Sequence, residues 1–542
     1  MLLDIHFCKK ELLFPISLSL LIVTLTILPI IYGYLRSNED YKFIGLLSDP
    51  TDANTYLAWM KQAQEGNILF EEKFSTEKQP KNIFILYFLS GGFISRILKI
   101  PLPIVYQIMR MISAFTLLMV VYLFIAFFLE TKLGRRITFL LICSSAGFGG
   151  YFASLYHFFG FKLPPRWIPL DQNMPELVTF WIITGYGHLS LALSFMLIIF
   201  LFMLFSIEKN KKIFSIFAGF LCFILALFHP YDIITIFIVL GFYFLFLLIT
   251  KKYPLKTLIL NYVLMLLISS PAVAYLYYIL LTNPVIKGWS KIAYPPFSCP
   301  IGYIFAFGFI FFMAILGIFE IIKKRKDRFY FLIFWIVVIS IFIYYPFLFI
   351  QRHASTGIHI PFCILAIVGF LRLCEQFNWF DGKVLKRKGI FLFSIFLLLT
   401  TPTNLMHLVV DFRNAHIRKF PYFLDKELVE AFIWLDKNIS SDSIVLASRK
   451  VSNFIPAYTG SKVYIGHYAE TIEHHKKEKI FEKFMQVDTQ DSFRIEFLDK
   501  NGIKYFFFSD FEKSIGGFNP DTVFYLSEIF KNDKIKIYKV NR

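Results

Sequence analysis

Long apolar runs separated by short polar loops fill the first 410 residues of the chain. A helix needs about 20 apolar residues to cross a bilayer, and eleven runs approach or exceed that length. The pattern therefore predicts a polytopic α-helical membrane protein with about 11 transmembrane helices. The predicted spans are residues 12–34, 111–129, 137–155, 189–207, 213–228, 233–250, 257–281, 301–319, 329–350, 359–373 and 390–410.

The polar remainder of the chain shows a different pattern, in which strand-like and helix-like stretches alternate. Such alternation is typical of an α/β domain with a mainly parallel sheet. We therefore divide the chain into a transmembrane domain (1–410), with a first outer loop at 35–110, and a C-terminal domain (411–542). Helices are predicted at 426–437, 470–485, 491–499 and 522–530, and strands at 443–448, 462–467, 503–508 and 534–540.

Composition agrees with the membrane assignment and excludes a single water-soluble enzyme. Apolar residues make up 57% of the chain and charged residues only 17%, whereas soluble domains carry about 25% charged residues. The net charge of +18 could suit a nucleic-acid-binding protein, but residues 411–542 hold only +2 of it. The rest lies in the membrane region, where Lys and Arg collect for topological reasons. We therefore expect no nucleic-acid partner.

The distribution of Lys and Arg between the loops predicts the orientation of the protein. The loops on one side hold 21 of these residues, and the short loops on the other side hold 5 in a similar total length. The richer side and the N-terminus are therefore expected to be cytoplasmic. An odd number of spans then makes the C-terminal domain extracytoplasmic, on the same side as loop 35–110. The first span lacks a cleavage site, so we expect a retained anchor in the cell membrane.

The first outer loop holds the best candidates for chemistry. Asp49 and Asp52 follow the first span closely and flank a proline turn, ahead of a predicted amphipathic helix at 53–64. Aromatic residues on one face of that helix suit the headgroup layer. A second interfacial or re-entrant helix is predicted within 81–99. Both aspartates could instead serve only to cap the first of these helices, because a carboxylate there accepts bonds from free backbone amides.

The chain thus begins with one span, an aspartate early in the outer loop, two juxtamembrane helices and a return span that starts just after Arg110. This arrangement resembles the GT-C superfamily of integral-membrane glycosyltransferases. The resemblance implies that Asp49 is the catalytic base or assists metal and donor binding, with Asp52 as the alternative. It also implies a second acidic residue in the loop between the third and fourth spans, where Asp171 and Glu176 lie. Glu176 could equally cap the helix that follows it.

The same resemblance implies a polyprenyl-phosphate-linked sugar as the donor and a mannosyltransferase-like or arabinosyltransferase-like activity. We expect inverting transfer of a hexosyl or pentosyl group to a glycan, lipid or protein acceptor, in contact with membrane lipid. A divalent cation, Mg²⁺ or Mn²⁺, could assist, and no other cofactor is expected. The chain lacks the paired Asp-Glu of protein mannosyltransferases and the WWDYG signature of oligosaccharyltransferases, so the subclass stays open.

Transfer from a lipid phosphate also needs positive charge where the phosphate leaves. Arg110, Arg166, Arg352 and His353 lie at predicted outer ends of spans and could bind the donor phosphate. Arginine suits this function because its fork binds two phosphate oxygens at once. Lys287 is a weaker candidate, and simple snorkelling to the interface would explain Arg352 equally well.

Other ionisable residues are expected at the outer membrane level or in the C-terminal domain. His188, His229 and Asp232 fall at the ends of spans, where ionisable groups are candidates for function. His229 and Asp232 could ligate a metal, although hydrogen bonding in a turn and helix capping explain them as well. His474 and His475, in contrast, are predicted to lie on a solvated helix face of the C-terminal domain.

Two other classes of function stay open from the sequence. A transporter or lipid-linked-glycan flippase would need charged residues near the midplane of several spans. Spans 111–129 and 233–250 contain none, which disfavours that class. A non-catalytic membrane scaffold would need none of this chemistry, and only activity data would separate it from an enzyme.

Overall fold

The computed structural model describes residues 9–289, 299–344 and 351–541. The chain divides into two compact units. Unit 1 comprises Met1–Leu28, Met109–Leu276 and Ala293–Asp411, and unit 2 comprises Pro29–Ile108, Tyr277–Ile292 and Phe412–Arg542. The division of the chain at residue 410 into a membrane domain and a C-terminal domain stays a prediction.

Apolar helices dominate the chain up to residue 411, as the hydrophobic pattern predicts. Within the described residues, eight helices are long and apolar enough to cross a bilayer, and two further spans consist of bent helix pairs. The fifth predicted span, 213–228, is the shorter apolar helix α9 (Ile213–Ala226), and residues 345–350 of the ninth lie outside the described residues. The polytopic helical fold is confirmed. The spans are α1 (Lys9–Arg36), α4 (Leu102–Phe128), α5 with α6 (Lys132–Ser144, Gly149–Phe159), α8 (Gly187–Glu208), α10 (Tyr231–Ile249), α11 (Leu255–Thr282), α13 with α14 (Pro300–Phe307, Phe309–Lys324), α15 (Tyr330–Tyr344), α16 with α17 (Gln351–Ala354, His359–Gln376) and α18 with α19 (Arg387–Thr400, Pro402–Ile417).

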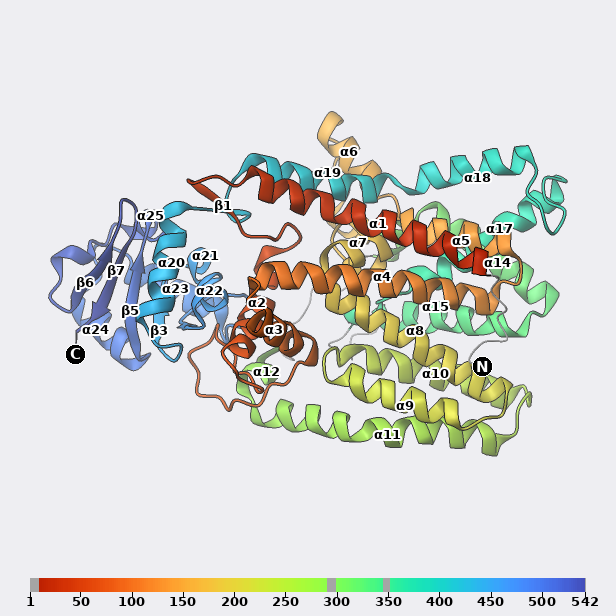
Figure 1. Ribbon diagram of the computed structural model, residues 1–542, viewed down its shortest axis with the longest axis horizontal. Helices are drawn as coiled ribbons and strands as arrows, with labels where there is room; N and C mark the ends of the chain where they lie inside the picture. The colour runs from red at the N-terminus through yellow and green to blue at the C-terminus, as the bar shows by residue number, and fades with distance from the viewer. Residues whose placement is uncertain (1–8, 290–298, 345–350, 542) are drawn as a thin grey trace. The chain divides into compact units, whose positions relative to one another are not determined.

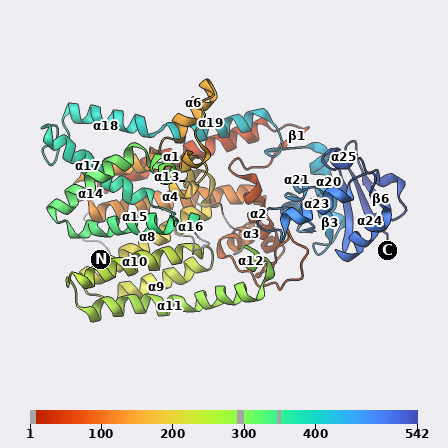
Figure 2. The same cartoon turned by 180° about the vertical axis from the view of Figure 1, so that it is seen from behind.

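Two of the spans are broken by residues that cannot continue a helix. Helices α13 and α14 meet at 88°, where Gly308 adopts a φ of 51° in the left-handed region. Helices α18 and α19 meet at 46°, and Pro402 begins the second of them. Glycine and proline are the usual causes of such sharp bends. Within unit 1, α8, α9, α10 and α15 run side by side (Figures 1 and 2).

Two glycines let helices α14 and α17 approach to backbone contact in unit 1. A Cβ added to Gly317 would lie 1.9 Å from the carbonyl oxygen of Leu365, and one added to Gly369 would lie 2.2 Å from that of Met313. Small residues at such crossings allow the van der Waals packing that drives helix association in membranes. This crossing therefore depends on both positions having no side chain.

The first outer loop contains two short helices of unit 2. Helix α2 (Pro50–Gln64) covers the predicted helix at 53–64, and α3 (Leu86–Leu98) lies within the predicted 81–99 segment. They pack closely because Gly92 of α3 faces the backbone of Met60, where a Cβ would lie 2.3 Å from the carbonyl oxygen. Both segments are therefore confirmed as helices, and their interfacial or re-entrant placement stays a prediction.

The C-terminal part of unit 2 is built on a mixed sheet with strand order β4-β3-β5-β7-β6. Strand β3 pairs in parallel with β4 and β5, whereas β7 pairs antiparallel with β5 and β6. The α/β class is confirmed, but the expectation of a mainly parallel sheet is wrong. The strands are β3 (Ile444–Leu446), β4 (Lys462–Val463), β5 (Ile503–Phe508), β6 (Leu526–Lys531) and β7 (Lys536–Val540).

The helix predicted at 522–530 is also wrong, because β6 occupies most of that segment. Strand β6 forms a hairpin with β7, which satisfies its backbone groups across the sheet. The turn is held by the side chain of Asn532, whose oxygen accepts bonds from the backbone amides of Lys534 and Ile535. Predicted helices at 426–437, 470–485 and 491–499 appear as α20 (Lys426–Asn438), α23 (His474–Phe484) and α24 (Asp491–Lys500).

The first outer loop is bonded to this sheet within unit 2. The backbone amide of Val463 in β4 donates to the carbonyl oxygen of Lys73 at 2.9 Å. Beside it, Lys462 and Lys73 both bind Glu71, at 2.7 and 2.9 Å, and Glu71 is buried. Pairing of this kind covers the edge strand, which would otherwise expose unpaired backbone groups.

We expect Gly317→Ala to destabilise the protein more than Gly241→Ala does. The added methyl of Gly317→Ala collides with a backbone atom, and overpacking of this type costs about 1–3 kcal/mol. Gly241 in α10 is the matched control, because its Cβ would meet only the hydroxyl of Tyr262, at 3.3 Å. Thermal unfolding in detergent measures both variants, and equal melting temperatures would contradict the close crossing.

Candidate active site

Asp49 begins α2 in a constrained backbone conformation. Its φ is 39°, in the left-handed region, and the following Pro50 restricts its backbone further. A left-handed backbone costs a residue with a side chain about 1–2 kcal/mol. The side chain caps the helix by accepting a bond from the amide of Asp52 at 3.3 Å, so the cap is Asp49 rather than the nearer Asp52. Backbone strain of this kind is common at functional sites.

Asp52 is bonded to a histidine from the C-terminal part of unit 2. Its Oδ1 lies 2.7 Å from Nε2 of His467, which is 4% exposed. The other ring nitrogen of His467, Nδ1, accepts a bond from the amide of Ala469 at 3.3 Å. Nδ1 therefore carries no proton, and Nε2 donates its proton to Asp52. The pair is a hydrogen bond between a carboxylate and a neutral imidazole that holds Asp52 in place.

Two further carboxyl groups, Glu72 and Glu470, form a buried pair near Asp52 and His467. Burial raises the pKa of Glu72 to about 7 and raises the pKa of Glu470 well above its ordinary value. The two carboxyl groups hydrogen-bond each other and share one proton, because two adjacent ionised carboxylates would repel. Trp59 Nε1 also donates to Glu72, at 3.3 Å.

In unit 1, Glu176 holds an arginine and approaches a histidine. Glu176 lies in the 3-10 turn η3 (Pro175–Leu177) and is 2% exposed. Its Oε1 accepts a bond from Arg352 Nε at 2.8 Å and lies 3.7 Å from His353 Nδ1. Burial raises the pKa of Glu176, while the neighbouring guanidinium acts to lower it. The bond through Nε fixes the plane of the guanidinium group.

His353 also belongs to a group of aromatic and acidic side chains at the start of α10. His229 Nδ1 lies 2.9 Å from Oδ2 of Asp232, which is fully buried. The His229 ring lies 6.0 Å from those of both His188 and His353, and Tyr231 stacks on His353 at 4.4 Å. We call Glu176, His188, His229, Asp232, Arg352 and His353 the outer cluster.

Asp171, which the sequence suggests as a second acidic ligand, holds a chain turn together. One carboxylate oxygen, Oδ2, accepts bonds from the amides of Gly147 and Gly149, at 3.0 and 3.1 Å, and from the hydroxyl of Thr403 at 2.8 Å. The residue is fully buried, and burial raises its pKa to about 7 despite these bonds. These contacts assign Asp171 a structural task at the break between α5 and α6; a ligand role stays a prediction.

Arg110 and Arg166, the other two residues predicted to bind the donor phosphate, lie in different environments. Arg110 is buried inside α4, because that helix already begins at Leu102. Its Nη1 donates to the hydroxyl of Thr26 in α1, at 3.1 Å, and to the carbonyl oxygen of Ile183, at 2.8 Å. Arg110 is therefore not at the entrance of its span. Arg166 is exposed in a short 3-10 turn.

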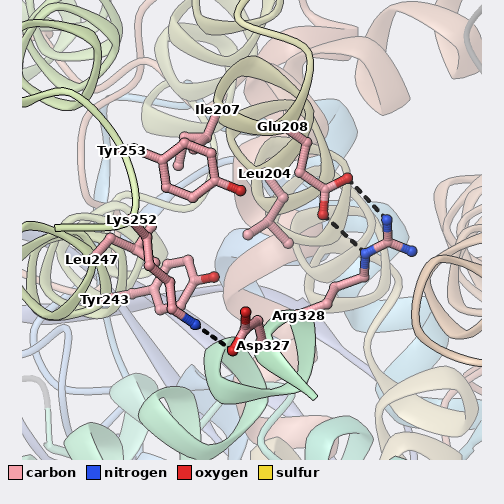
Figure 3. Close-up of a pocket in the computed structure, with 9 residues that line it drawn as sticks. All are labelled: Leu204, Ile207, Glu208, Tyr243, Leu247, Lys252, Tyr253, Asp327 and Arg328. Atoms are coloured by element: carbon pink, nitrogen blue, oxygen red, sulfur yellow. Dashed lines mark hydrogen bonds and ion pairs between the residues drawn. The ribbon is translucent and has the colours of Figure 1, made fainter. Parts of the chain in front are cut away.

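A pocket of about 460 Å³ is lined in part by the last residues of α8 (Figure 3), whereas His188 of the outer cluster lies near the start of that helix. Helix α8 has 22 residues, from His188 near its start to Glu208 at its end, which corresponds to about 33 Å. Both cations of the pocket are already paired: Arg328 with Glu208, and Lys252 with Asp327. The pocket therefore has little positive charge left for a phosphate.

Sequence reasoning missed the carboxyl pair of Glu72 and Glu470. Glu71 and Glu72 stand between apolar residues in the run ILFEEKF, and acidic residues inside an apolar stretch are the one signal that could have drawn attention to them. Glu470 has no such signal, because its partner comes from a distant part of the chain.

Comparisons with known proteins identify the fold. No family model matches the chain, and no curated protein matches it. Among solved structures, the apo oligosaccharyltransferase of Archaeoglobus fulgidus superposes with a TM-score of 0.56 at 12% identity, covering 91% of this chain and 69% of that one. ArnT from Cupriavidus metallidurans in the apo state gives 0.51 at 10% identity, covering 96% and 98% of the two chains.

A third similar structure is the arabinofuranosyltransferase AftD from Mycobacteria, with a TM-score of 0.50 at 10% identity. The superposition covers 96% of this chain and 41% of that one. All three are GT-C glycosyltransferases. The protein therefore has the fold of the GT-C superfamily and is a multi-pass membrane protein.

The structural task of Asp171 predicts a pH-dependent difference between Asp171→Asn and the parent. Because folding raises the pKa of this carboxyl group to about 7, its contribution to stability is lost as the pH rises from about 4 to about 7. An asparagine keeps an acceptor oxygen and does not ionise. The melting temperature of Asp171→Asn should therefore rise relative to that of the parent as the pH increases from 5 to 8. A difference in melting temperature between the variant and the parent that does not change with pH would contradict this prediction.

Proposed function

We propose that the protein is a membrane glycosyltransferase that transfers a sugar from a polyprenyl-phosphate-linked donor to an acceptor on the outer face of the membrane. The observation that carries the proposal is the fold, which matches GT-C glycosyltransferases over more than nine tenths of the chain. The outer cluster and the strained Asp49 supply side chains of the types that such a transfer needs. The acceptor is a glycan, a lipid or a protein.

The outer cluster supports binding of the donor phosphate. Arg352 is 31% exposed at its side chain while its Nε stays on the buried Glu176. A guanidinium whose plane is already fixed loses little rotamer entropy when it binds phosphate oxygens. His353 lies beside the same carboxylate. We therefore assign the donor phosphate to Arg352 and His353 in preference to Arg110, which is engaged inside the helix bundle, and to Arg166.

Asp49 is the proposed base. In the reaction, the acceptor hydroxyl gives its proton to the carboxylate while its oxygen bonds to the anomeric carbon. The bond from that carbon to the phosphate oxygen breaks, so the polyprenyl phosphate leaves and the configuration inverts. General-base help of this kind is worth roughly 10² to 10⁴ in rate. Asp52 is the second choice, because its carboxylate is already bonded to His467.

A divalent cation is an optional part of the proposal. Asp232 is fully buried, its Oδ2 lies 2.9 Å from Nδ1 of His229, and its Oδ1 accepts no hydrogen bond from the described residues. Asp232 and His229 offer one oxygen and one nitrogen donor, a mixed pair that suits Mn²⁺ better than Mg²⁺. When bound, such an ion would neutralise charge on the leaving phosphate. Asp171 fits less well, since its Oδ2 already accepts three bonds.

The orientation in the membrane is also part of the proposal. We place the N-terminus in the cytoplasm and residues 411–542 outside the cell membrane, because of the loop charges. The starts of α8 and α10 then face outward, and the paired Lys252 and Arg328 lie on the cytoplasmic side. The donor and the acceptor would meet on the outer side.

Asp49→Asn should fold normally but lose sugar transfer by at least about 10²-fold, because an amide cannot accept the acceptor's proton. Asparagine can still cap α2, so the helix should survive. Membranes holding each variant are given radiolabelled polyprenyl-phosphate sugars, and the transferred label is counted. Asp488→Asn, at an exposed position in unit 2, is the control. Equal transfer by Asp49→Asn and the parent would remove Asp49 as the base.

Arg352→Lys should lower kcat/KM for the donor by about tenfold or more. The lysine keeps a positive charge near Glu176 but cannot bind two phosphate oxygens in a fixed plane. Arg166→Gln is the comparison, and we expect it to change donor kinetics little because that residue is exposed. Initial rates at varied donor concentration separate the two. A larger loss in Arg166→Gln than in Arg352→Lys would reverse the assignment of the phosphate site.

A further inference from the structure

Helix α23 of unit 2 begins with two histidines, and the first of them is not solvated. His474 is 6% exposed, which corrects the expectation of a solvated face for it, while His475 is exposed. The reason lies in the spacing of the buried residues of α23. His474, Lys477, Phe481 and Phe484 are all buried, and intervals of three or four place them on one face of a helix. His474 is the first residue of that inward face.

Both ring nitrogens of His474 are buried without a hydrogen-bond partner among the described residues. A buried imidazole normally has one nitrogen that donates and one that accepts. Leaving such groups unsatisfied is costly, and each case in a folded protein calls for an explanation. A ligand at one of the two nitrogens would supply that explanation.

Two further donor groups lie beside His474. One nitrogen of His474, one nitrogen of His475 and a carboxylate oxygen of Glu478 all lie within 4.8 Å of one another. His474 and Glu478 are four residues apart, so they lie on the same side of the helix, one turn apart. Two imidazoles and a carboxylate form a donor set suited to zinc and similar transition ions.

We propose that His474, His475 and Glu478 bind a divalent transition-metal ion, with Zn²⁺ as the reference ion. Three protein ligands leave one tetrahedral position for water or a further donor. This site lies in unit 2, shares no residue with the outer cluster and does not rest on the proposed glycosyltransferase activity.

The side chain of Arg449 competes with a metal ion for Glu478, and this competition provides a test of the proposal. Arg449 Nε lies 3.8 Å from Oε1 of Glu478, and its side chain is 52% exposed. Exposed pairs of this kind contribute little stability, so the metal can displace the arginine from Glu478. Removing the arginine charge should therefore strengthen metal binding, whereas a purely structural role of Glu478 would give no such gain.

The segment around the site suggests what the ion does. Lys477 of α23 binds Glu77 of the first outer loop at 2.7 Å. His467, which holds Asp52, lies a few residues before the helix. A metal at the first turn of α23 would fix the start of the helix and the segment that precedes it. We therefore assign the ion a structural role. It would hold in place the segment that contains His467, the residue that binds Asp52.

Zinc binding by the full-length protein in detergent tests the proposal. The protein is stripped with a chelator, titrated with ZnCl₂ by calorimetry, and its zinc content is measured by elemental analysis. Glu478→Gln and His474→Ala should each lose one zinc relative to the parent, or bind it at least about tenfold more weakly. His157→Ala, at an exposed histidine of α6, should bind as the parent does. Arg449→Gln should bind zinc severalfold more tightly.

The melting temperature provides a second readout that separates metal loss from misfolding. Zinc should raise the melting temperature of the parent and of His157→Ala, because an ion that binds only the folded state stabilises it. Glu478→Gln alters a partly exposed side chain, so it should melt like the parent without zinc and gain less with zinc. Parent protein that binds no zinc, or equal binding by the parent, Glu478→Gln and His474→Ala, would overturn the proposal.

Discussion

A bilayer offers no hydrogen-bond partners to a polypeptide, and this constraint organises both the helices and the chemistry of unit 1. Polar groups that lie in the apolar region must therefore form hydrogen bonds with other groups of the protein. Arg110 does so by donating to the hydroxyl of Thr26 and to the carbonyl oxygen of Ile183. Asp171, in the loop after α6, is buried as well, and it binds two backbone amides and a hydroxyl at the break between α5 and α6. Residues that satisfy the fold in this way are poorly placed to bind a substrate as well.

In unit 2, the first outer loop depends on the sheet of the C-terminal part. Lys73 pairs with β4 through its backbone, and its side chain shares Glu71 with Lys462. Glu72 then faces Glu470, and the two can remain buried together only because a proton lies between them. Two ionised carboxylates in contact would repel strongly at such low exposure. The position of α2, and with it the positions of its aspartates, is thus set by contacts that the loop makes far along the chain.

The sequence predicts the helical fold well because a bilayer requires long apolar runs, and such runs are visible residue by residue. It fails where tertiary pairing decides the structure. Residues 522–530 carry a pattern that suits a helix, yet pairing with β7 makes most of them a strand. His474 was expected in solvent, although its spacing to Phe481 and Phe484 is that of a buried face. For the candidate site, the sequence points to single residues such as Arg352, but the bond that orients its guanidinium comes from Glu176, which is distant in the chain.

The start of α2 shows how two neighbouring carboxylates can take different tasks. Asp52 is held by His467, whose tautomer is set by the amide of Ala469, so its charge is matched by a donor that the fold supplies. Asp49 occupies a left-handed position before a proline and caps α2 by accepting a bond of 3.3 Å from the amide of Asp52. A cap alone does not require that conformation, because most helices are capped by residues with extended backbones. The left-handed conformation of Asp49 therefore does not follow from capping alone, which agrees with the proposed use of its carboxylate as a base.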